Sequence, residues 1–477
     1  MLQRFGGIRA DQHAHMDLMK MISELTPALD VVTDLEAGSH VKHILRPSSV
    51  VKSLLKYHPQ EIGQRLGGEV PRLLSFWRQF RRANRENLDA HPILGGKSLQ
   101  ELQFYIPVTI HEDAGSISKA QGATIVSWSS LLALGSEKVS HYPIGTWTRP
   151  KTNWDRSRLD PFWDATMRDF SALAAGVVAG QEILPLSSGE CLKIVLLFAK
   201  GDEQVRADEW FLHHYNAADE CCPDCHANRS TVPFTDCRSV AAWRQAAPMS
   251  MDQYRDRMKR PLHRMTASRF FWHNFYYPDY MHLLDCRGIS AIIYGSILDT
   301  LLHRPSVGSN MAARLALLNH MKEQWYNQHP GFIRLPEFTR ASLKMADGWC
   351  ELHGPNVKAA NTRQASGLIR HLAWTLCTED TILDATIREV AASLDSLYQI
   401  MHESPMFFLL MRNGASMGTC WSLWLACNVF EAYLRHRAAN AGKYRPRCTG
   451  CAIWIHIQRV AILVVWPVTL MKVMWVR

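Results

Sequence analysis

The spacing of hydrophobic and polar residues changes near residue 104. In residues 50–57 and 70–87, apolar side chains recur at helical spacing, which predicts amphipathic helices in the N-terminal region. From Phe104 onward, apolar residues form short runs bounded by turn formers, which is typical of β-strands. The pattern therefore predicts a helical region over residues 1–103, followed by a sheet. The expected strands are Phe104–Ile110, Ala123–Leu134 and Tyr142–Thr148.

A helix and a fourth strand follow these three runs. Residues 161–180 have helical periodicity, with a proline at the start and a glycine at the end. Residues 191–199 are almost continuously apolar, as in a strand that is buried on both faces. The order strand, strand, strand, helix, strand predicts an α/β protein whose mixed sheet is RNase H-like, with helices on both faces. In that fold the first strand is central and the fourth lies beside it.

Two aspartates follow the first and fourth expected strands. Asp113 comes at the end of the first strand, before a turn expected at Gly115, and Asp202 follows the fourth. Adjacent strands would bring the two carboxylates to one edge of the sheet, although 89 positions separate them. Two carboxylates can bind a pair of Mg²⁺ or Mn²⁺ ions for phosphodiester chemistry, and such sites usually include a third. The alternative is that both are turn or cap residues, which is common for aspartate.

Cys222 and Cys225 form a CxxC motif, whose turn lets both thiolates face one Zn²⁺. One such motif supplies half of a tetrahedral site, so two ligands must come from elsewhere. The alternative is a pair of free thiols in a loop. Candidates for the remaining ligands are His213, His214, His226, Cys237, His282, Cys448 and Cys451.

His282 precedes an apolar helix expected over residues 289–302. Together with Asp279 or Asp285, it has the composition of a metal ligand and the carboxylate that orients it. A core histidine beside a helix-capping aspartate would give the same sequence. Both interpretations stay open.

The chain carries a formal net charge of +9, which permits a polyanionic partner such as DNA. A basic and aromatic stretch between Tyr254 and Tyr277 has the composition of a surface that clamps nucleic acid. An ordinary solvated surface would look the same, and so would the arginine-rich run between Arg78 and Arg85. The expected nucleic-acid-binding residues are Arg255, Arg257, Lys259, Arg260 and Arg264.

Twelve cysteines occur in a chain whose first residues lack the apolar core of a signal peptide. This favours a reducing compartment, where close cysteine pairs act as metal ligands. Near the C-terminus, residues 452–476 are mostly apolar, but the longest uninterrupted run has 12 residues, fewer than the ~20 of a spanning helix. We therefore expect no membrane association, and a tail anchor is the alternative.

Several of these motifs together resemble those of the DDE transposases of the CACTA and Kyakuja-Dileera-Zisupton groups and of the related V(D)J recombinase catalytic subunit. The resemblance is strongest to transposon-derived proteins of protists, and it covers residues 104–405. It implies DNA cleavage and strand transfer, with Asp113 and Asp202 as catalytic magnesium ligands and a helical zinc-bearing insertion that opens at the CxxC motif. It also implies DNA as the partner, the nucleus as the location, and a homodimer as one form of assembly. The matching segments are residues 110–115, 127–132, 200–203, 222–229, 233–236 and 278–282.

The resemblance ends near residue 406. The family's last catalytic acid, a glutamate after a pair of histidines, has no counterpart in matching context, and Glu431 is the only late glutamate on an expected helix. We therefore expect a truncated, degenerate transposase with little cleavage activity, and a non-enzymatic DNA-binding relic is the alternative. The expected regions are residues 1–103, 104–215, 216–405 and 406–477: a helical N-terminal region, an RNase H-like core, a CxxC insertion with helices, and a divergent apolar tail.

Overall fold

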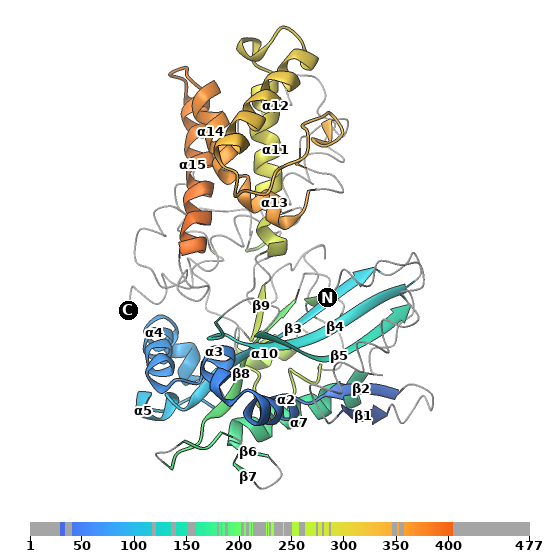
Figure 1. Ribbon diagram of the computed structural model, residues 1–477, viewed down its shortest axis with the longest axis vertical. Helices are drawn as coiled ribbons and strands as arrows, with labels where there is room; N and C mark the ends of the chain where they lie inside the picture. Colours follow the sequence, from blue (N-terminus) through green and yellow to red (C-terminus); the bar gives the residue numbers. More distant parts are fainter. Residues whose placement is uncertain are drawn as a thin grey trace. The chain divides into compact units, whose positions relative to one another are not determined.

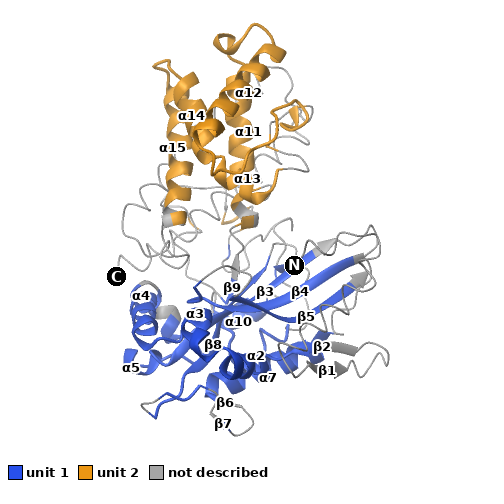
Figure 2. Ribbon diagram, in the orientation of Figure 1, with its two compact units in different colours: residues 1–226, 247–278 blue, residues 227–246, 279–477 orange. Residues whose placement is uncertain are grey.

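The computed structural model has a mixed α/β fold, and its described residues divide into two compact units (Figure 2). Unit 1 comprises residues 1–226 and 247–278, and unit 2 comprises residues 227–246 and 279–477. These units divide the chain differently from the four regions expected from sequence, because residues 1–103 belong to the same unit as the sheet. The structure describes residues 29–33, 41–116, 121–134, 140–150, 159–178, 181–182, 184–186, 189–201, 205–206, 209–210, 212, 226, 228, 230–232, 242, 250–256, 263–272, 275–278, 281–285, 288–345, 351–352 and 357–403.

Among the described residues, unit 1 is built on a five-stranded mixed sheet with the order β5-β4-β3-β8-β9 (Figure 1). The first three strands form an antiparallel meander, and β8 then pairs with β3 in parallel. A short fifth strand pairs with β8, also in parallel. The expectation that the first strand is central and the fourth lies beside it is confirmed. The strands are β3 (Tyr105–Ser116), β4 (Gln121–Ser130), β5 (His141–Pro150), β8 (Lys193–Gly201) and β9 (Tyr276–Pro278).

The end of β3 differs from the sequence expectation. A turn at Gly115 was expected to follow Asp113, but β3 continues to Ser116 and pairs with β4 along its whole second half. Asp113 therefore lies within the strand, opposite Ile125. The expectation was wrong because the partner strand is long enough to satisfy the backbone of residues 113–116, which overrides the local preference of glycine for turns.

Helices cover both faces of the sheet. Phe80 of α4 (Val70–Asp89) contacts Phe198 of β8, and Phe198 is paired with Thr109 of β3. Phe170 of α7 (Asp160–Ala175) contacts Trp128 of β4, which is paired with Ile110. Because neighbouring residues of a strand point to opposite faces, Thr109 and Ile110 mark the two sides. The helices α4 and α7 therefore lie on opposite faces, as expected.

The N-terminal segment of unit 1 is attached to this layer through a buried hydrogen-bonded carboxylate. Ser48 donates to Asp169 of α7 from its backbone N–H at 2.8 Å and from its hydroxyl at 2.6 Å. These bonds satisfy a carboxylate that would be costly to bury alone. The remaining elements of unit 1 are β1 (Leu29–Thr33), β2 (Val41–Leu45), α2 (Pro47–Tyr57), η2 (Pro59–Glu61), α3 (Ile62–Leu66), α5 (Leu99–Leu102), β6 (Val177–Val178), β7 (Gln181–Glu182) and α10 (Met251–Asp256).

The described part of unit 2 is helical, and α11 (Ile289–Leu302) lies in its core. This is the apolar helix expected over residues 289–302, and Tyr294, Ile297 and Leu298 are fully buried along it. A helix that is apolar on all sides requires partners all round, and the surrounding helices provide them. They are η4 (Met281–Asp285), η5 (Pro305–Val307), α12 (Met311–Gln328), α13 (Ala359–Gln364), α14 (Ser366–Leu376) and α15 (Ile382–Glu403).

Buried aspartates connect the helices of unit 2. Asp285 accepts hydrogen bonds from Arg363 at 2.7 and 2.9 Å and from the Tyr398 hydroxyl. Asp384 forms a two-pronged ion pair with Arg304 and also accepts the Glu379 N–H at 3.0 Å. Each aspartate thus joins segments that lie far apart in the sequence.

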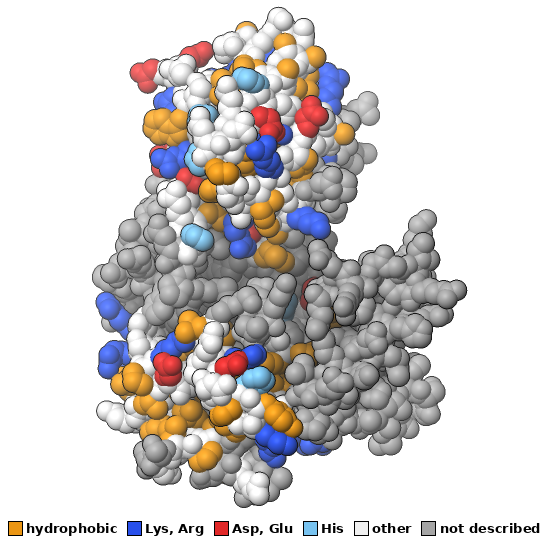
Figure 3. Space-filling model, in the orientation of Figure 1, with side chains coloured by type: hydrophobic (Ala, Val, Ile, Leu, Met, Phe, Trp, Pro, Cys, Tyr) orange, Lys and Arg blue, Asp and Glu red, His pale blue; other side chains and the backbone are white. Residues whose placement is uncertain are grey.

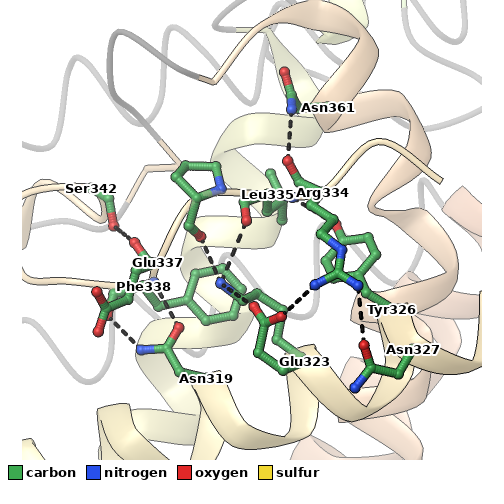
Figure 4. Close-up of polar contacts among 12 residues, drawn as sticks. Asn319, Glu323, Tyr326, Asn327, Arg334, Leu335, Glu337, Phe338, Ser342 and Asn361 are labelled. Atoms are coloured by element: carbon green, nitrogen blue, oxygen red, sulfur yellow. Dashed lines mark hydrogen bonds and ion pairs between the residues drawn. The ribbon is translucent and has the colours of Figure 1, made fainter. Parts of the chain in front are cut away.

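An extended segment after α12 is fixed to that helix by polar contacts (Figure 4). Arg334 reaches Glu323 at 2.8 Å and Asn327 at 3.0 Å, while Asn361 donates to the Arg334 carbonyl. Lys322 of α12 is buried to 3% exposure and donates to the carbonyls of Leu335 and Pro336 at 3.4 and 3.0 Å. The backbone of this segment therefore finds its partners on the side chains of α12 and α13.

Candidate functional site

The candidate site lies where the parallel pairing of β3 and β8 ends. The last pair in their register joins Glu112 to Gly201. Asp113 and Asp202 are the next residues along the two strands' chains. Asp202 itself lies outside the described residues. The two strands are thus paired, as expected, up to the residue that precedes each aspartate.

Glu112 and Asp113 have opposite surroundings. Strand alternation points them to different faces, and Glu112 is fully buried whereas Asp113 is exposed. Among the described residues, no side chain forms a hydrogen bond or an ion pair with the Asp113 carboxylate, so its oxygens are open to a cation. An exposed carboxylate on a strand supplies the hard oxygen ligands that Mg²⁺ and Mn²⁺ prefer.

An indole holds the buried carboxylate of Glu112. Trp210 donates from Nε1 to the Glu112 carboxylate at 2.7 Å, and both side chains are buried. The Trp210 ring stacks on Tyr276 of β9, with ring centroids 4.9 Å apart. The Tyr276 hydroxyl in turn lies 2.5 Å from that of Thr266. The Glu112 carboxylate of β3 is therefore bonded to a stack of two buried aromatic rings, Trp210 and Tyr276, and Tyr276 belongs to β9.

Gly201, the last residue of β8, allows the Trp210 ring to pack directly against the strand. A Cβ at this position would lie 2.8 Å from Val205 Cγ1, 3.0 Å from the Trp210 ring and 3.1 Å from the Glu112 carbonyl oxygen. Such distances are shorter than van der Waals contact, so only glycine fits without displacement. The chain beyond Gly201 turns back through bonds from Glu209 and Trp210 to the Val205 carbonyl, at 2.8 and 3.1 Å. Gly201 is therefore closely packed against Val205 and Trp210.

The stack keeps Tyr276 neutral. Burial raises the pKa of the Tyr276 phenol above its ordinary value, the bond with Thr266 lowers it, and the charge of Glu112 raises it further. A neutral phenol next to Thr266 satisfies one buried hydroxyl with another. The stack is therefore a structural support, and the exposed Asp113 is the group that can meet a ligand.

Of the candidate zinc ligands, only His226 has a described side chain, and it is exposed. Cys222, Cys225, Cys448 and Cys451 lie outside the described residues, as does the side chain of His282. Within the described ranges, no three histidine, cysteine, aspartate or glutamate side chains gather as a metal ion requires. Asp285, considered as a carboxylate that orients His282, is instead engaged by Arg363 and Tyr398.

The expected DNA-binding arginines are partly occupied by contacts within unit 1. Arg255 lies 3.6 Å from Asp252 and over the ring of Phe271. Arg264 lies 3.1 Å from Asp160 and 3.7 Å from Asp164. Contacts with carboxylates on the same unit weaken the attraction of these arginines for phosphate. Arg257, Lys259 and Arg260 lie outside the described residues.

The sequence reading missed Glu112, Trp210 and Gly201 as parts of the site. A usable signal existed for Glu112, because it continues the buried face of Ile106, Val108 and Ile110 at a period of two. An acidic residue on such a face needs a buried donor, which the sequence does not identify.

Comparisons with known proteins give no family for the chain. The sequence matches no protein-family model, and none of the curated proteins is significantly similar to it. No helix in the described residues is long and apolar enough to cross a membrane. The apolar tail over residues 406–477 lies outside the described residues.

Proposed function

We propose that unit 1 is an RNase H-like core of DDE transposase descent that binds divalent cations through Asp113 and Asp202. The parallel pairing of β3 with β8, which ends at Glu112 and Gly201, is the observation that carries the proposal. It is supported by the sheet order β5-β4-β3-β8-β9, since RNase H-like sheets place the first strand between the second and the fourth. The helical zinc-bearing insertion remains part of this proposal.

The chemistry follows from the ligand type. Two Mg²⁺ ions, when bound, would activate a water nucleophile and stabilise the leaving 3′ oxygen of a DNA phosphodiester. Asp113 contributes an exposed carboxylate on a rigid strand, and Trp210 together with Gly201 fixes the backbone beside Asp202. In strand transfer, the freed 3′ hydroxyl then attacks a second DNA phosphodiester.

We expect the lack of a third carboxylate among the described residues to limit the activity. Glu112 is the nearest acidic neighbour of Asp113 in sequence, but it points to the opposite face and its carboxylate accepts the Trp210 N–H. It therefore does not complete a three-carboxylate site. We expect the core to bind metal ions and DNA more readily than it cleaves DNA. The second experiment below therefore distinguishes an active nuclease from a relic that binds DNA without cleaving it.

Titration of the full-length protein with Mn²⁺, followed by electron paramagnetic resonance, tests the cation site. We expect Asp113→Asn and Asp202→Asn each to weaken Mn²⁺ binding by about tenfold or more, as loss of one carboxylate ligand does. The matched control is Asp380→Asn, which removes an exposed carboxylate from unit 2 and should leave binding unchanged. Equal Mn²⁺ affinity in wild type and Asp113→Asn would refute the proposal.

Nicking of supercoiled plasmid in Mn²⁺ separates enzyme from relic. Nicking by the wild type that disappears in Asp202→Ala indicates a surviving nuclease. Mn²⁺ and DNA binding without nicking in either protein indicates the relic.

A further inference from the structure

The outward face of α4 carries a group of arginines. Arg78, Arg82 and Arg85 are exposed, and no acidic residue occurs in α4 before Glu86. Arg78 and Arg82 are one helical turn apart, and Arg85 follows Asn84, whose backbone leaves helical geometry at φ −135° and ψ 39°. Lys and Arg side chains stand at the edge of unit 1 where α4 lies (Figures 1 and 3).

The opposite face of α4 is fixed in the core of unit 1. Phe76, Trp77 and Phe80 are buried there, and their rings contact one another. Trp77 donates from Nε1 to the carbonyl of Tyr105 at 2.8 Å, at the first residue of β3. The helix is therefore rigidly attached to the strand that carries Asp113, and its outward side chains are displayed on a fixed surface.

The outward arginines have few partners on the protein. Among the described residues, neither Arg78 nor Arg82 forms an ion pair or a side-chain hydrogen bond. Arg85 is 80% exposed and lies 3.7 Å from Asp89, a weak surface contact. Arg81 differs, because it is half-buried and donates to the Lys97 carbonyl at 2.8 Å. Arg78 and Arg82 thus keep their donors free for a ligand, and Arg85 is held only by a weak surface contact.

We propose that Arg78, Arg82 and Arg85 form the phosphate-binding surface through which unit 1 holds the DNA backbone. Arg78 and Arg82 are four residues of helix apart, a rise of about 6 Å, and two steps along one strand of duplex DNA advance about 7 Å, so their guanidinium groups can reach phosphates two steps apart. Guanidinium donors bind phosphate oxygens in a bidentate manner and carry no sequence preference. The identity of the partner as DNA rests on the proposed function, whereas the surface itself rests on the exposure and charge of α4.

Salt dependence of DNA binding tests this surface. Fluorescence anisotropy with a ~30-base-pair duplex is measured in EDTA, so that metal binding makes no contribution. Replacing all three arginines by glutamine should weaken binding at least about tenfold at low salt and lower the slope of log K against log[salt] by about 2 to 3, because each lost phosphate contact removes about 0.9. Replacement of the three by lysine should restore most of the slope, since the charges remain.

A control variant removes the same number of charges from separate elements. Lys52 of α2, Arg168 of α7 and Arg340 of unit 2 are all exposed. Their joint replacement by glutamine should change the slope by much less than the α4 variant does. Hydrogen exchange in β3 and β8 confirms that each variant is folded.

The outcomes separate the surface from the metal site. Three results would each overturn the proposed phosphate-binding surface. They are an unchanged slope in the α4 variant, an equal loss of slope in the scattered control, and no salt-dependent DNA binding by the wild type. If the α4 variant loses DNA binding while Asp113→Asn leaves Mn²⁺ binding intact, the surface stands and the metal site fails. If the α4 variant loses DNA binding but keeps the Mn²⁺ binding that Asp113→Asn loses, both stand.

Discussion

Unit 1 and unit 2 bury polar side chains in different ways. In unit 1, Glu112 is held by a neutral indole, and two histidines, His91 and His263, are buried within the aromatic core. In unit 2, the buried carboxylates of Asp285 and Asp384 are paired with arginines. The polar groups of unit 2 therefore join helices to one another, whereas Glu112 of unit 1 lies beside the candidate site. The two units should consequently respond differently to mutation and to pH, and hydrogen-exchange mass spectrometry resolves them in the intact chain.

Breaking the Asp384 pair should give the largest effect. Arg304 is 13% exposed, so Asp384→Ala leaves its charge in a poorly solvated position, and removing one partner of a buried pair costs about 3–5 kcal/mol. We expect exchange protection to fall in α11, α14 and α15 and to stay unchanged in β3 and β8. Asp380→Ala, at an exposed position, is the control and should cost less than about 0.5 kcal/mol. An equal loss of protection in both units would show that they unfold together.

Acid should destabilise unit 1 first. Burial lowers the pKa of His91 to about 3, and burial with the nearby charge of Arg264 lowers the pKa of His263 to about 3. Between pH 3 and about 6.5 the unfolded chain binds these protons and the folded chain does not, so stability falls as pH falls. Two such histidines give a slope of about 2–3 kcal/mol per pH unit below pH 6.5.

Unit 2 should resist acid to a lower pH. Burial alone would raise the pKa of Asp384, but the bonds from Arg304 and the Glu379 N–H hold it below its ordinary value. The stabilisation it provides is therefore complete above its ordinary pKa and is lost only below about pH 4. Exchange at pH 7, 6 and 5, corrected for intrinsic rates, measures the contrast. His263→Gln should halve the slope of unit 1, whereas the exposed His320→Gln should leave it unchanged; identical slopes in all three proteins would contradict the assignment.

The Trp210→Phe substitution should have an intermediate effect. It removes the N–H that the Glu112 carboxylate accepts, at a cost of about 1–3 kcal/mol confined to unit 1. Trp77→Phe also removes a buried indole donor, but its acceptor is the Tyr105 carbonyl, so we expect a smaller loss of about 0.5–1.5 kcal/mol. Denaturant unfolding followed by exchange in β3 measures both. A larger loss in Trp77→Phe would show that the bond to Glu112 is unimportant.

The smallest effect is expected at Lys322. Lys322→Met keeps the apolar stem and removes a buried ammonium, so the lost bonds to Leu335 and Pro336 are offset by the relief of burying a charge. We expect a net loss of about 1 kcal/mol, with faster exchange limited to residues 333–338. Arg334→Met removes an exposed ion pair with Glu323 and should change stability by a few tenths of a kcal/mol. Faster exchange throughout α11 would show that Lys322 supports the whole unit.

The sequence predicted the elements whose pattern is local. The strands near 104–110 and 191–199 and the helix over 289–302 were found where expected, because alternating or continuous apolar runs are set by burial of nearby residues. The end of β3 was misjudged, since the length of its partner strand decides how far it extends. Local pattern therefore predicts that an element exists better than where it ends.

The partners of the buried polar side chains could not be predicted from the sequence. Asp285 meets Arg363, 78 positions later, and Tyr398, 113 positions later, and nothing near Asp285 identifies either partner. The same holds for Glu112 and Trp210, which are 98 positions apart. The two aspartates proposed for the metal site differ, because strand order alone predicts which strand ends lie together.

The path of the chain determines when unit 1 can be completed during synthesis. Residues 227–246 belong to unit 2, and only afterwards does the chain return to add Trp272 and β9 to unit 1. β9 ends 77 residues after β8, so the edge of β8, an apolar strand, awaits its neighbour for about 4–15 s at a translation rate of about 5–20 residues per second. An exposed apolar edge is a site of aggregation, so nascent chains that end between residues 201 and 278 should be the species that chaperones bind on the ribosome.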